Sequence, residues 1–308
     1  MVRELDAILI AGPTASGKSA LAMELAERHG GVVVNADSMQ VYDALRILTA
    51  RPPDADMARV EHRLYGHVPA EVSYSTGAWY RDAAAVVAEL RRTGRVPVFV
   101  GGTGLYFRAL LGGLSDMPAT PPEIRQRWRE RLAEEGAEKL HAELAERDPE
   151  AAKTIRAADR QRIVRALEVV DATGRSILSF QSGEGVPLID ANRSRKILLM
   201  PDRQELRARI ATRFRQMVEE GAINEVRRLL DRGLAIDLPA MKAIGVKELQ
   251  SVIENKSEIV DAEAHAVTAT RQYAKRQMTW FRNQLDENWA TFSEPEQALA
   301  DRLDPFSR

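Results

Sequence analysis

The sequence predicts an α/β fold with a parallel sheet at its core and an all-helical module inserted into the chain. Four short apolar runs have the length and composition of buried parallel strands, and stretches with helical periodicity separate them. Alternation of this kind is typical of parallel α/β folds. After the third run, a long stretch rich in Arg, Glu and Ala interrupts the alternation, so we expect a separate helical module there.

The predicted strands and the first helices follow one another along the chain. The strands span residues 7–10, 32–34, 96–100 and 196–200. One helix is predicted directly after the first strand, at 20–28, and a longer one before the third strand, at 76–92. These segments form the expected core.

Two further helices are predicted after the fourth strand. The first, at 204–220, presents one apolar stripe to the core. The stripe consists of Leu206, Ile210, Phe214 and Met217. The second helix, at 261–283, places Tyr273, Gln277 and Trp280 on one side.

Composition predicts the boundaries of the helical module. A Pro-rich segment at 117–122 lies near its start, and a Gly-containing segment at 182–187 lies near its end. We therefore expect a core of residues 1–115 and 194–308, and a module of residues 116–193.

The composition is that of a globular protein and excludes several kinds of site. Of 308 residues, 44% are hydrophobic and 29% are charged, which argues against disorder. The absence of Cys excludes disulfides, thiolate catalysis and Cys-based zinc sites, and the His residues show no ligand spacing. No signal peptide is predicted, and no segment approaches the ~20 apolar residues of a membrane span. We expect a cytoplasmic location, no membrane association and a monomer.

Basic residues are unevenly distributed, although the formal net charge is only −1. Residues 193–215 contain eight basic side chains and two acidic ones, and residues 271–282 contain four basic side chains and no acidic one. Such clusters occur both on surfaces that bind polyanions and on solvated helix faces. Both interpretations stay open.

The most informative motif lies between the first predicted strand and the helix after it. It consists of Gly12, Pro13, Thr14, Ala15, Ser16, Gly17, Lys18 and Ser19. The two glycines allow several backbone N–H groups to converge on one anion, Lys18 adds a positive charge, and the Ser19 hydroxyl can ligate Mg²⁺. The helix N-terminus favours the same anion. The motif predicts a polyphosphate site without indicating which phosphate compound it holds.

Two more segments are expected at the same edge of the sheet, because the carboxyl ends of neighbouring parallel strands meet there. The first contains Asp37, for which three roles are open: to hold Mg²⁺ through water, to act as a general base, or to cap a following helix. The second is a Gly-rich turn at 101–104 that offers the hydroxyl of Thr103. We expect a substrate to approach this turn closely, although a simple strand-to-helix turn has the same composition.

Two basic segments lie outside this edge. Residues 159–165 combine an amide with three guanidinium groups within two helical turns, and residues 241–247 form a basic, Gly-containing stretch. Each segment either contacts a phosphate backbone or forms a solvated surface.

Six segments, in order along the chain, together resemble the bacterial tRNA dimethylallyltransferases. They read GPTASGKS, ADSMQVY, GGTGLYF, DRQRIVRALEV, IGVKEL and TRQYAKRQMTWFR. The similarity covers almost the whole chain and is therefore far more specific than the phosphate motif alone. One difference is Val246, where we expect an aromatic residue in this family.

The resemblance implies a P-loop kinase-like core with an inserted tRNA-binding module that grips the anticodon stem-loop. It implies transfer of a dimethylallyl group from dimethylallyl diphosphate to the exocyclic amine of the adenosine directly 3′ of the anticodon, with Mg²⁺ as cofactor. Asp37 is then the base, and residues 14–19, including Lys18, hold the diphosphate with Mg²⁺. Arg213 is a candidate for a second contact to the diphosphate. The residues implied to contact tRNA are Asp37, Ser38, Met39, Gln40, Thr103, Arg125, Gln161, Arg162, Ile163, Val164, Arg165, Lys242 and Lys247.

Two other functions use a similar loop. A P-loop small-molecule or nucleoside kinase would bind ATP there and use Asp37 to activate a hydroxyl group. A GTPase-like switch would need a guanine-recognition motif, Asn-Lys-x-Asp, which the sequence lacks.

Overall fold

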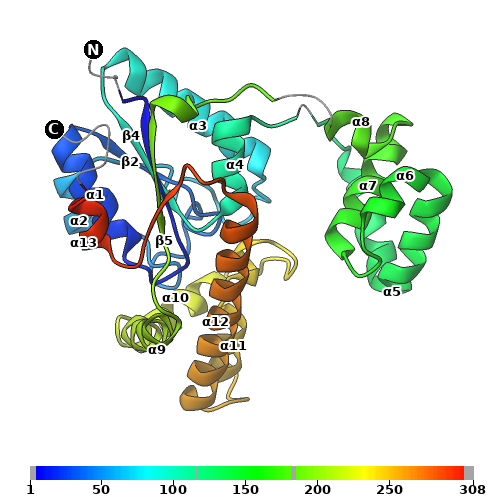
Figure 1. Ribbon diagram of the computed structural model, residues 1–308. Coiled ribbons are helices and arrows are strands. Elements are labelled where there is room, and N and C mark those ends of the chain that lie inside the picture. The colour runs from blue at the N-terminus through cyan, green and yellow to red at the C-terminus, as the bar shows by residue number, and fades with distance from the viewer. Residues whose placement is uncertain (1–4, 116, 182–184, 302–308) are drawn as a thin grey trace. The chain divides into compact units, whose positions relative to one another are not determined.

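The computed structural model describes residues 5–115, 117–181 and 185–301. The chain divides into two compact units, shown in Figure 1. The core unit combines Met1–Leu111 with Leu188–Arg308, and the helical unit is Gly112–Pro187. None of the described helices combines the length and the hydropathy that a membrane-spanning segment needs.

A parallel sheet forms the centre of the core unit. Its strands lie in the order β3-β2-β4-β1-β5-β6. They are β1 (Ala7–Ala11), β2 (Val32–Asn35), β3 (His62–Arg63), β4 (Pro97–Gly101), β5 (Ser194–Leu199) and β6 (Ala290–Phe292). The central strand β1 pairs in parallel with β4 on one side and β5 on the other, so that Ile10 lies opposite both Val100 and Ile197. The predicted α/β class and all four predicted strands are confirmed.

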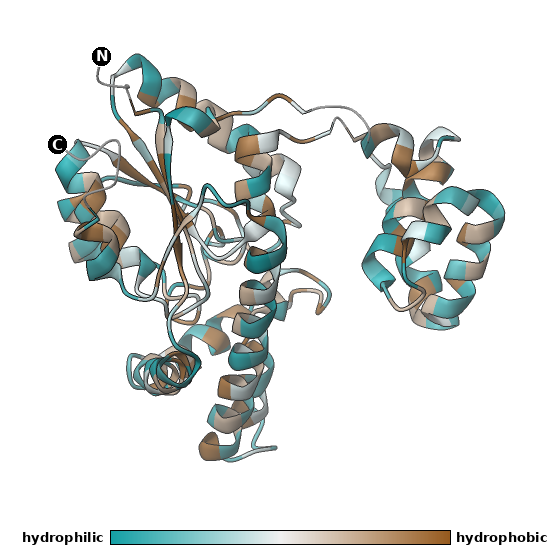
Figure 2. Cartoon of the chain, in the orientation of Figure 1, coloured by the Kyte–Doolittle hydropathy of each residue, from teal (hydrophilic) through white to brown (hydrophobic). Residues whose placement is uncertain are grey.

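Helices cover both faces of this sheet, because successive side chains of β1 point to opposite faces. Ile8 and Ile10 pack in a cluster with α1, whereas Leu9 packs in the larger cluster that includes α3 and α4. In Figure 1, α1 and α13 lie on one side of the sheet and α3 and α4 on the other. Figure 2 shows the apolar residues concentrated along the strands between these layers.

The described helices of the core unit are α1 (Lys18–His29), α2 (Asp54–Arg59), α3 (Thr76–Arg92), α4 (Gly104–Gly112), α9 (Arg203–Glu219), α10 (Ala222–Leu230), α11 (Val246–Ile253), α12 (Ile259–Gln284) and α13 (Pro295–Leu299). Four of them, α1, α3, α9 and α12, are the helices that the sequence predicts. The predicted stripe of α9 is buried at Leu206, Ile210 and Phe214. Leu206 and Ile210 pack against Ala274 and Met278 of α12, so the stripe joins the two helices.

The helical unit has a hydrophobic core of its own. It comprises α5 (Pro122–Arg147), α6 (Pro149–Thr154), α7 (Arg160–Thr173) and α8 (Ile177–Gln181). Trp128 and Leu140 of α5 pack with Leu167 of α7 in this core. Gly136 interrupts α5 with a φ of 82°, which kinks the helix.

The unit boundaries lie a few residues from the predicted ones. The backbone N–H groups of Leu188 and Ile189 both donate to the carbonyl of Leu110, at 2.9 and 3.0 Å. Ile189 is also buried in the main core cluster. The chain therefore enters the core unit at residue 188, whereas the sequence predicts its return at 194.

Candidate active site

The phosphate-binding motif forms the turn between β1 and the first residue of α1, as predicted. Gly17 adopts a φ of 85° and Ala15 a φ of 63°, so the loop bends sharply beneath the helix N-terminus. Gly12 is required for close packing, because a Cβ there would lie 2.8 Å from the hydroxyl of Ser16 and 3.0 Å from the carbonyl of Leu199. The loop thus has the left-handed turns and the position of an anion-binding turn.

Two polar side chains of the loop, Lys18 and Ser16, differ in their hydrogen bonding. The Nζ of Lys18 donates to the carbonyl of Pro13 at 3.1 Å, which curls the lysine over the loop. The hydroxyl of Ser16 is buried and has no hydrogen-bond partner among the described residues. A buried hydroxyl without a partner is costly, and an anion or a hydrated ion in the loop would satisfy it.

Three charged groups form one electrostatic cluster beside the loop. Burial lowers the pKa of Lys18 to about 8, although the nearby carboxylate of Asp37 opposes this effect, and the guanidinium of Arg213 lowers the pKa further. Burial likewise lowers the pKa of Arg213, and Asp37 and Glu220 oppose it. Two desolvated cations therefore lie near one carboxylate, an arrangement that an added anion would relieve.

Asp37 lies in a turn held by its neighbours after β2. Its backbone N–H donates to the Oδ1 of Asn35, and the Nδ2 of Asn35 donates to the carbonyls of Asp37 and Leu64. The Oδ1 of Asp37 accepts the N–H of Met39 at 2.9 Å. No helix begins here, since the next one starts at Asp54, so the predicted capping role is wrong. The carboxylate closes a turn through its Oδ1, and its Oδ2 accepts no hydrogen bond from the residues that the structure describes.

The turn at 101–104 packs directly on the turn that contains Asp37. The N–H of Thr103 donates to the carbonyl of Ala36, and the Oγ1 of Thr103 accepts the N–H of Ser38. A Cβ at Gly101 would lie 2.0 Å from the carbonyl oxygen of Ala36, so only glycine fits. The two segments predicted to share one sheet edge are therefore in contact.

Three tyrosines without a predicted role lie close enough to Asp37 to feel its charge. Burial raises the pKa of Tyr65, Tyr106 and Tyr273 well above the ordinary value, and the carboxylate of Asp37 raises each further. The ring of Tyr106 stacks on Trp79 at 3.9 Å. Two of these tyrosines occur in segments that carry the family resemblance, but neither spacing nor periodicity indicates that they meet at Asp37.

Gln277 of α12 joins the two Gly-rich loops of the site. Its Oε1 accepts the N–H of Thr14 at 3.0 Å, and its Nε2 donates to the carbonyl of Gly102 at 2.9 Å. The sequence pattern places Gln277 on one side of its helix but assigns it no role.

The remaining predicted tRNA contacts of the core unit differ in accessibility. Lys242 and Lys247 are exposed, whereas Met39 is partly buried against the main core cluster. The Nε2 of Gln40 donates to the carbonyls of Thr49 and Ala50, so this amide holds a loop. Val246, the residue that differs from the family expectation, is buried in the same core cluster.

In the helical unit, the structure separates the predicted contacts into exposed and buried residues. Gln161 and Arg162 are exposed and Arg125 is partly exposed. Ile163 and Val164 are buried in the core of the unit, so their side chains are not exposed for the predicted RNA contact, which stays a prediction. Their apolar character within an amphipathic helix is the signal that identifies them as core residues.

Arg165 has a local role in the same unit. Its guanidinium donates to the Oγ1 of Thr120 at 2.6 Å, to the Oε2 of Glu168 at 3.2 Å and to the carbonyl of Pro118 at 3.4 Å. This side chain thereby fastens the start of the unit to α7.

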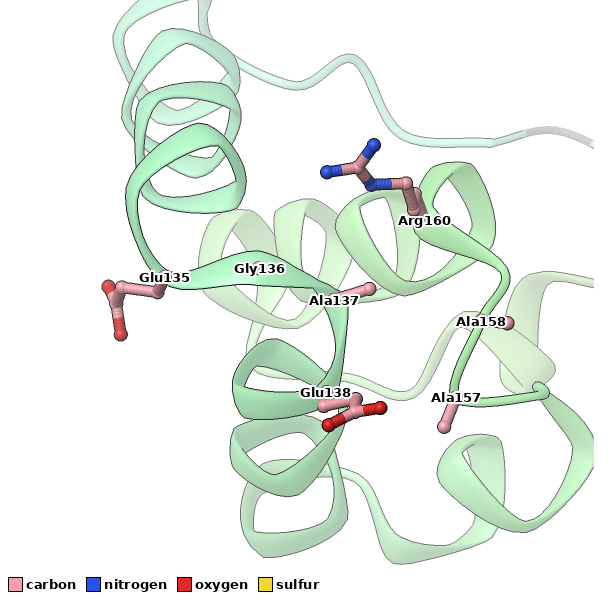
Figure 3. A pocket seen from close by; sticks show the side chains of 7 residues that line it. All are labelled: Glu135, Gly136, Ala137, Glu138, Ala157, Ala158 and Arg160. Carbon is pink, nitrogen blue, oxygen red and sulfur yellow. The ribbon is translucent and has the colours of Figure 1, made fainter.

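A separate hollow of the helical unit lies between the kink of α5 and the loop before α7 (Figure 3). Its lining consists of Glu135, Gly136, Ala137, Glu138, Ala157, Ala158 and Arg160. These residues are mostly small or acidic and offer no glycine-rich anion loop. The candidate chemistry therefore belongs to the core unit.

Comparison with known proteins assigns a family to this architecture. A sequence model described as IPP transferase matches residues 40–284, and one described as Isopentenyl transferase matches residues 5–68. The chain is 60% identical over 289 residues to a tRNA dimethylallyltransferase of Sinorhizobium medicae, covering 94% of this chain and 95% of that protein. It is 57% identical over 299 residues to one of Rhizobium meliloti, covering 96% and 98%.

Solved structures agree with the sequence comparisons. A tRNA isopentenylpyrophosphate transferase from Bacillus halodurans superposes with a TM-score of 0.65 at 34% identity, covering 92% of this chain and 88% of that one. A eukaryotic dimethylallyltransferase acting on tRNA superposes with a TM-score of 0.77 at 27% identity, covering 89% and 69%. The predicted resemblance is confirmed, and the chain belongs to the IPP transferase family.

Proposed function

We propose that this protein transfers the dimethylallyl group of dimethylallyl diphosphate to the exocyclic amine of the adenosine directly 3′ of the anticodon in tRNA, releasing diphosphate. The observation that carries the proposal is the placement of an anion-binding loop, with Lys18 and Arg213, beside the carboxylate of Asp37. The loop and its two cations suit a leaving anion, and the carboxylate suits a nucleophile that must lose a proton.

The loop and its two cations act on the leaving group. In the reaction, the bond between the allylic carbon and the diphosphate oxygen breaks, and its electron pair leaves with the diphosphate. Lys18 and Arg213 are desolvated, so they stabilise this developing charge more strongly than they would in water. Binding of the anion also restores a favourable environment for both cations.

Asp37 acts on the nucleophile. The adenine nitrogen forms the new bond to the allylic carbon and passes one proton to the carboxylate. The Oδ1 of Asp37 already accepts the N–H of Met39, so we assign the proton to Oδ2, which faces Gly102.

The residues of the loop fit a magnesium ion. Ser19 lies in the first turn of α1, where its side chain is exposed, and the Ser16 hydroxyl lies unpartnered in the same loop. We propose that the Ser19 hydroxyl and diphosphate oxygens together hold Mg²⁺. When bound, the ion adds to the neutralisation of the departing diphosphate.

The tRNA contacts follow from the exposed basic side chains. Arg162 of the helical unit and Lys242 and Lys247 of the core unit are available for phosphate contacts. The target base must leave the anticodon stack, which costs a few kcal/mol and is offset by such contacts. All residues of the proposed chemistry come from one chain, which fits a monomer, and we propose the cytoplasm as its location.

The decisive experiment is incubation of the protein with labelled dimethylallyl diphosphate, Mg²⁺ and unmodified tRNA, followed by nucleoside analysis. Label on the adenosine next to the anticodon is the expected result. A kinase would instead consume ATP with a small acceptor and leave the tRNA unlabelled. The relatives named above are tRNA-acting transferases, so the comparisons favour the transferase.

A further inference from the structure

Gln277 is the side chain that connects the loop proposed to hold the leaving group with the turn beside the proposed base. It joins the N–H of Thr14 on one side and the carbonyl of Gly102 on the other, from positions 263 and 175 residues away in the sequence. Gln277 is only 6% exposed. Loss of the amide would leave both backbone groups without this partner in a desolvated place, so the clamp is strongly favoured.

The contact between Gln277 and Gly102 leaves no room for a side chain at residue 102. A Cβ at Gly102 would lie 2.1 Å from the Nε2 of Gln277 and 3.4 Å from the Oδ2 of Asp37. The amide and the carboxylate therefore approach the same glycine. A displacement of Gly102 relative to Gln277 would alter the surroundings of the carboxylate oxygen that we assign as proton acceptor.

A second contact fixes the helix that carries Gln277. The indole of Trp280 lies against Gly104, where a Cβ would be 2.1 Å from the ring. Trp280 is three residues from Gln277, so both side chains lie on one side of α12. Figure 1 accordingly shows the carboxyl-terminal part of α12 beside α4. The helix thus holds the turn at 101–104 at two points and the phosphate loop at one.

We propose that Gln277 is a positioning residue that sets the distance between the departing diphosphate and the attacking adenine. This inference rests on the function proposed above. The Gln277 amide binds the phosphate loop at Thr14, and it also binds the turn beside Asp37 at Gly102. The loop is proposed to hold the diphosphate and Asp37 the adenine, so the amide links the two segments that hold the reactants. Transfer between two bound reactants depends steeply on such placement, and an error of 1 Å can cost about 10²-fold in rate.

The first test replaces Gln277 by Met, which has similar length and makes neither hydrogen bond. With saturating dimethylallyl diphosphate and tRNA, we expect the single-turnover rate of transfer to fall by at least ~10-fold, while the KM for dimethylallyl diphosphate and the Kd for tRNA change by less than ~3-fold. The matched control is Gln272→Met, an exposed position on the same helix, which should transfer at the wild-type rate.

The second test is Gln277→Glu, compared with wild type across pH. When protonated, the introduced carboxyl group can accept from Thr14 and donate to Gly102, as the amide does. When ionised, it loses the donor and repels the carbonyl of Gly102 and the carboxylate of Asp37. We therefore expect the ratio of variant to wild-type rate to rise as the pH falls from about 9 to about 6.

The outcomes separate this inference from the proposed function. Failure of the wild-type protein to label tRNA would refute the function itself. With an active wild type, an unchanged rate in Gln277→Met refutes the positioning role. Should that variant not fold, the Gln277→Glu ratio decides, and a ratio that does not change with pH overturns the proposal.

Discussion

Thr103 and Ser38 join the two strand ends of the site: the Oγ1 of Thr103 accepts the N–H of Ser38 at 2.9 Å and lies 3.3 Å from its hydroxyl. The turn after β4 therefore supports the turn after β2, in which Asp37 is the neighbour of Ser38. Because the same threonine also donates its N–H to Ala36, it holds the segment on both sides of the carboxylate.

Removal of the Thr103 hydroxyl is expected to impair catalysis without unfolding the protein. In Thr103→Val the N–H of Ser38 loses its acceptor, which costs about 1–3 kcal/mol of local stability, and the Asp37 turn is no longer fixed. We expect turnover to fall by ~10-fold or more. Thr103→Ser keeps the oxygen and should retain most of the activity. Equal turnover of Thr103→Val and Thr103→Ser would show that the hydroxyl is dispensable.

Asp37→Ala tests the proposed base. Turnover should fall by ~10²-fold or more, because the adenine amine loses both its orienting acceptor and its proton acceptor. The Kd for tRNA should change little. The control is Asp43→Ala, an exposed carboxylate that pairs with Arg232, and it should leave turnover unchanged. Turnover near the wild-type value in Asp37→Ala would exclude the role of base.

The sequence predicts those parts of the fold that depend on local patterns. Thr76–Arg92 is found with the predicted bounds, because its apolar periodicity is regular and the hydroxyl of Ser75 caps its first turn. The strands β3 and β6 were not predicted. They are two and three residues long, and their sequences, HR and ATF, lack an apolar run. These segments are strands because they pair with a neighbouring strand, and a local sequence pattern does not predict such pairing.

The same division applies to the site. Sheet topology brings the phosphate loop, Asp37 and Thr103 together, and that could be predicted because each directly follows a predicted strand. Gln277 contacts Thr14 across 263 positions of sequence, a contact that only the packing of α12 creates. Motif matching assigned an RNA contact to Ile163 although its side chain is buried, because it transferred a whole segment and ignored which side of the helix is apolar.

Gly104→Ala is expected to destabilise the core unit, since the added methyl group would overlap the ring of Trp280. Trp280 would have to move away, at a cost of about 1–3 kcal/mol. The control is Gly77→Ala, near the start of α3, where a Cβ has nothing closer than 3.8 Å and the helix gains from alanine. Thermal unfolding of both variants gives the comparison, and an equal Tm would contradict the tight contact.

Arg162 and Arg165 of α7 should have different effects. The side chain of Arg162 is 75% exposed and, among the described residues, forms an ion pair with Asp159 alone, at 3.3 Å. Arg162→Ala should therefore reduce the salt dependence of tRNA binding by about one unit of slope and leave Tm unchanged. Arg165→Ala should lower Tm instead, because buried Thr120 and Glu168 lose their partner. An unchanged salt slope in Arg162→Ala would show that this residue does not contact RNA phosphate.

Lys18 should make the protein less stable at neutral pH than in alkali. Its pKa is about 8 in the folded protein and 10.5 in the reference state, so the unfolded chain binds more protons between these values. The contribution of this residue to the free energy of unfolding therefore rises with pH across that window, and below it the cost approaches about 3 kcal/mol.

Lys18→Met removes that cost together with the charge that holds the diphosphate. We expect the variant to be more stable than wild type by up to about 3 kcal/mol near pH 7, with the advantage shrinking toward pH 10.5, and to be inactive in transfer. Urea unfolding at the two pH values measures the difference, and Lys242→Met controls for loss of an exposed charge. A stability difference that does not depend on pH would contradict the desolvation of Lys18. Burial of the charged Lys18 would then not destabilise the free protein, and bound diphosphate would have no such destabilisation to offset.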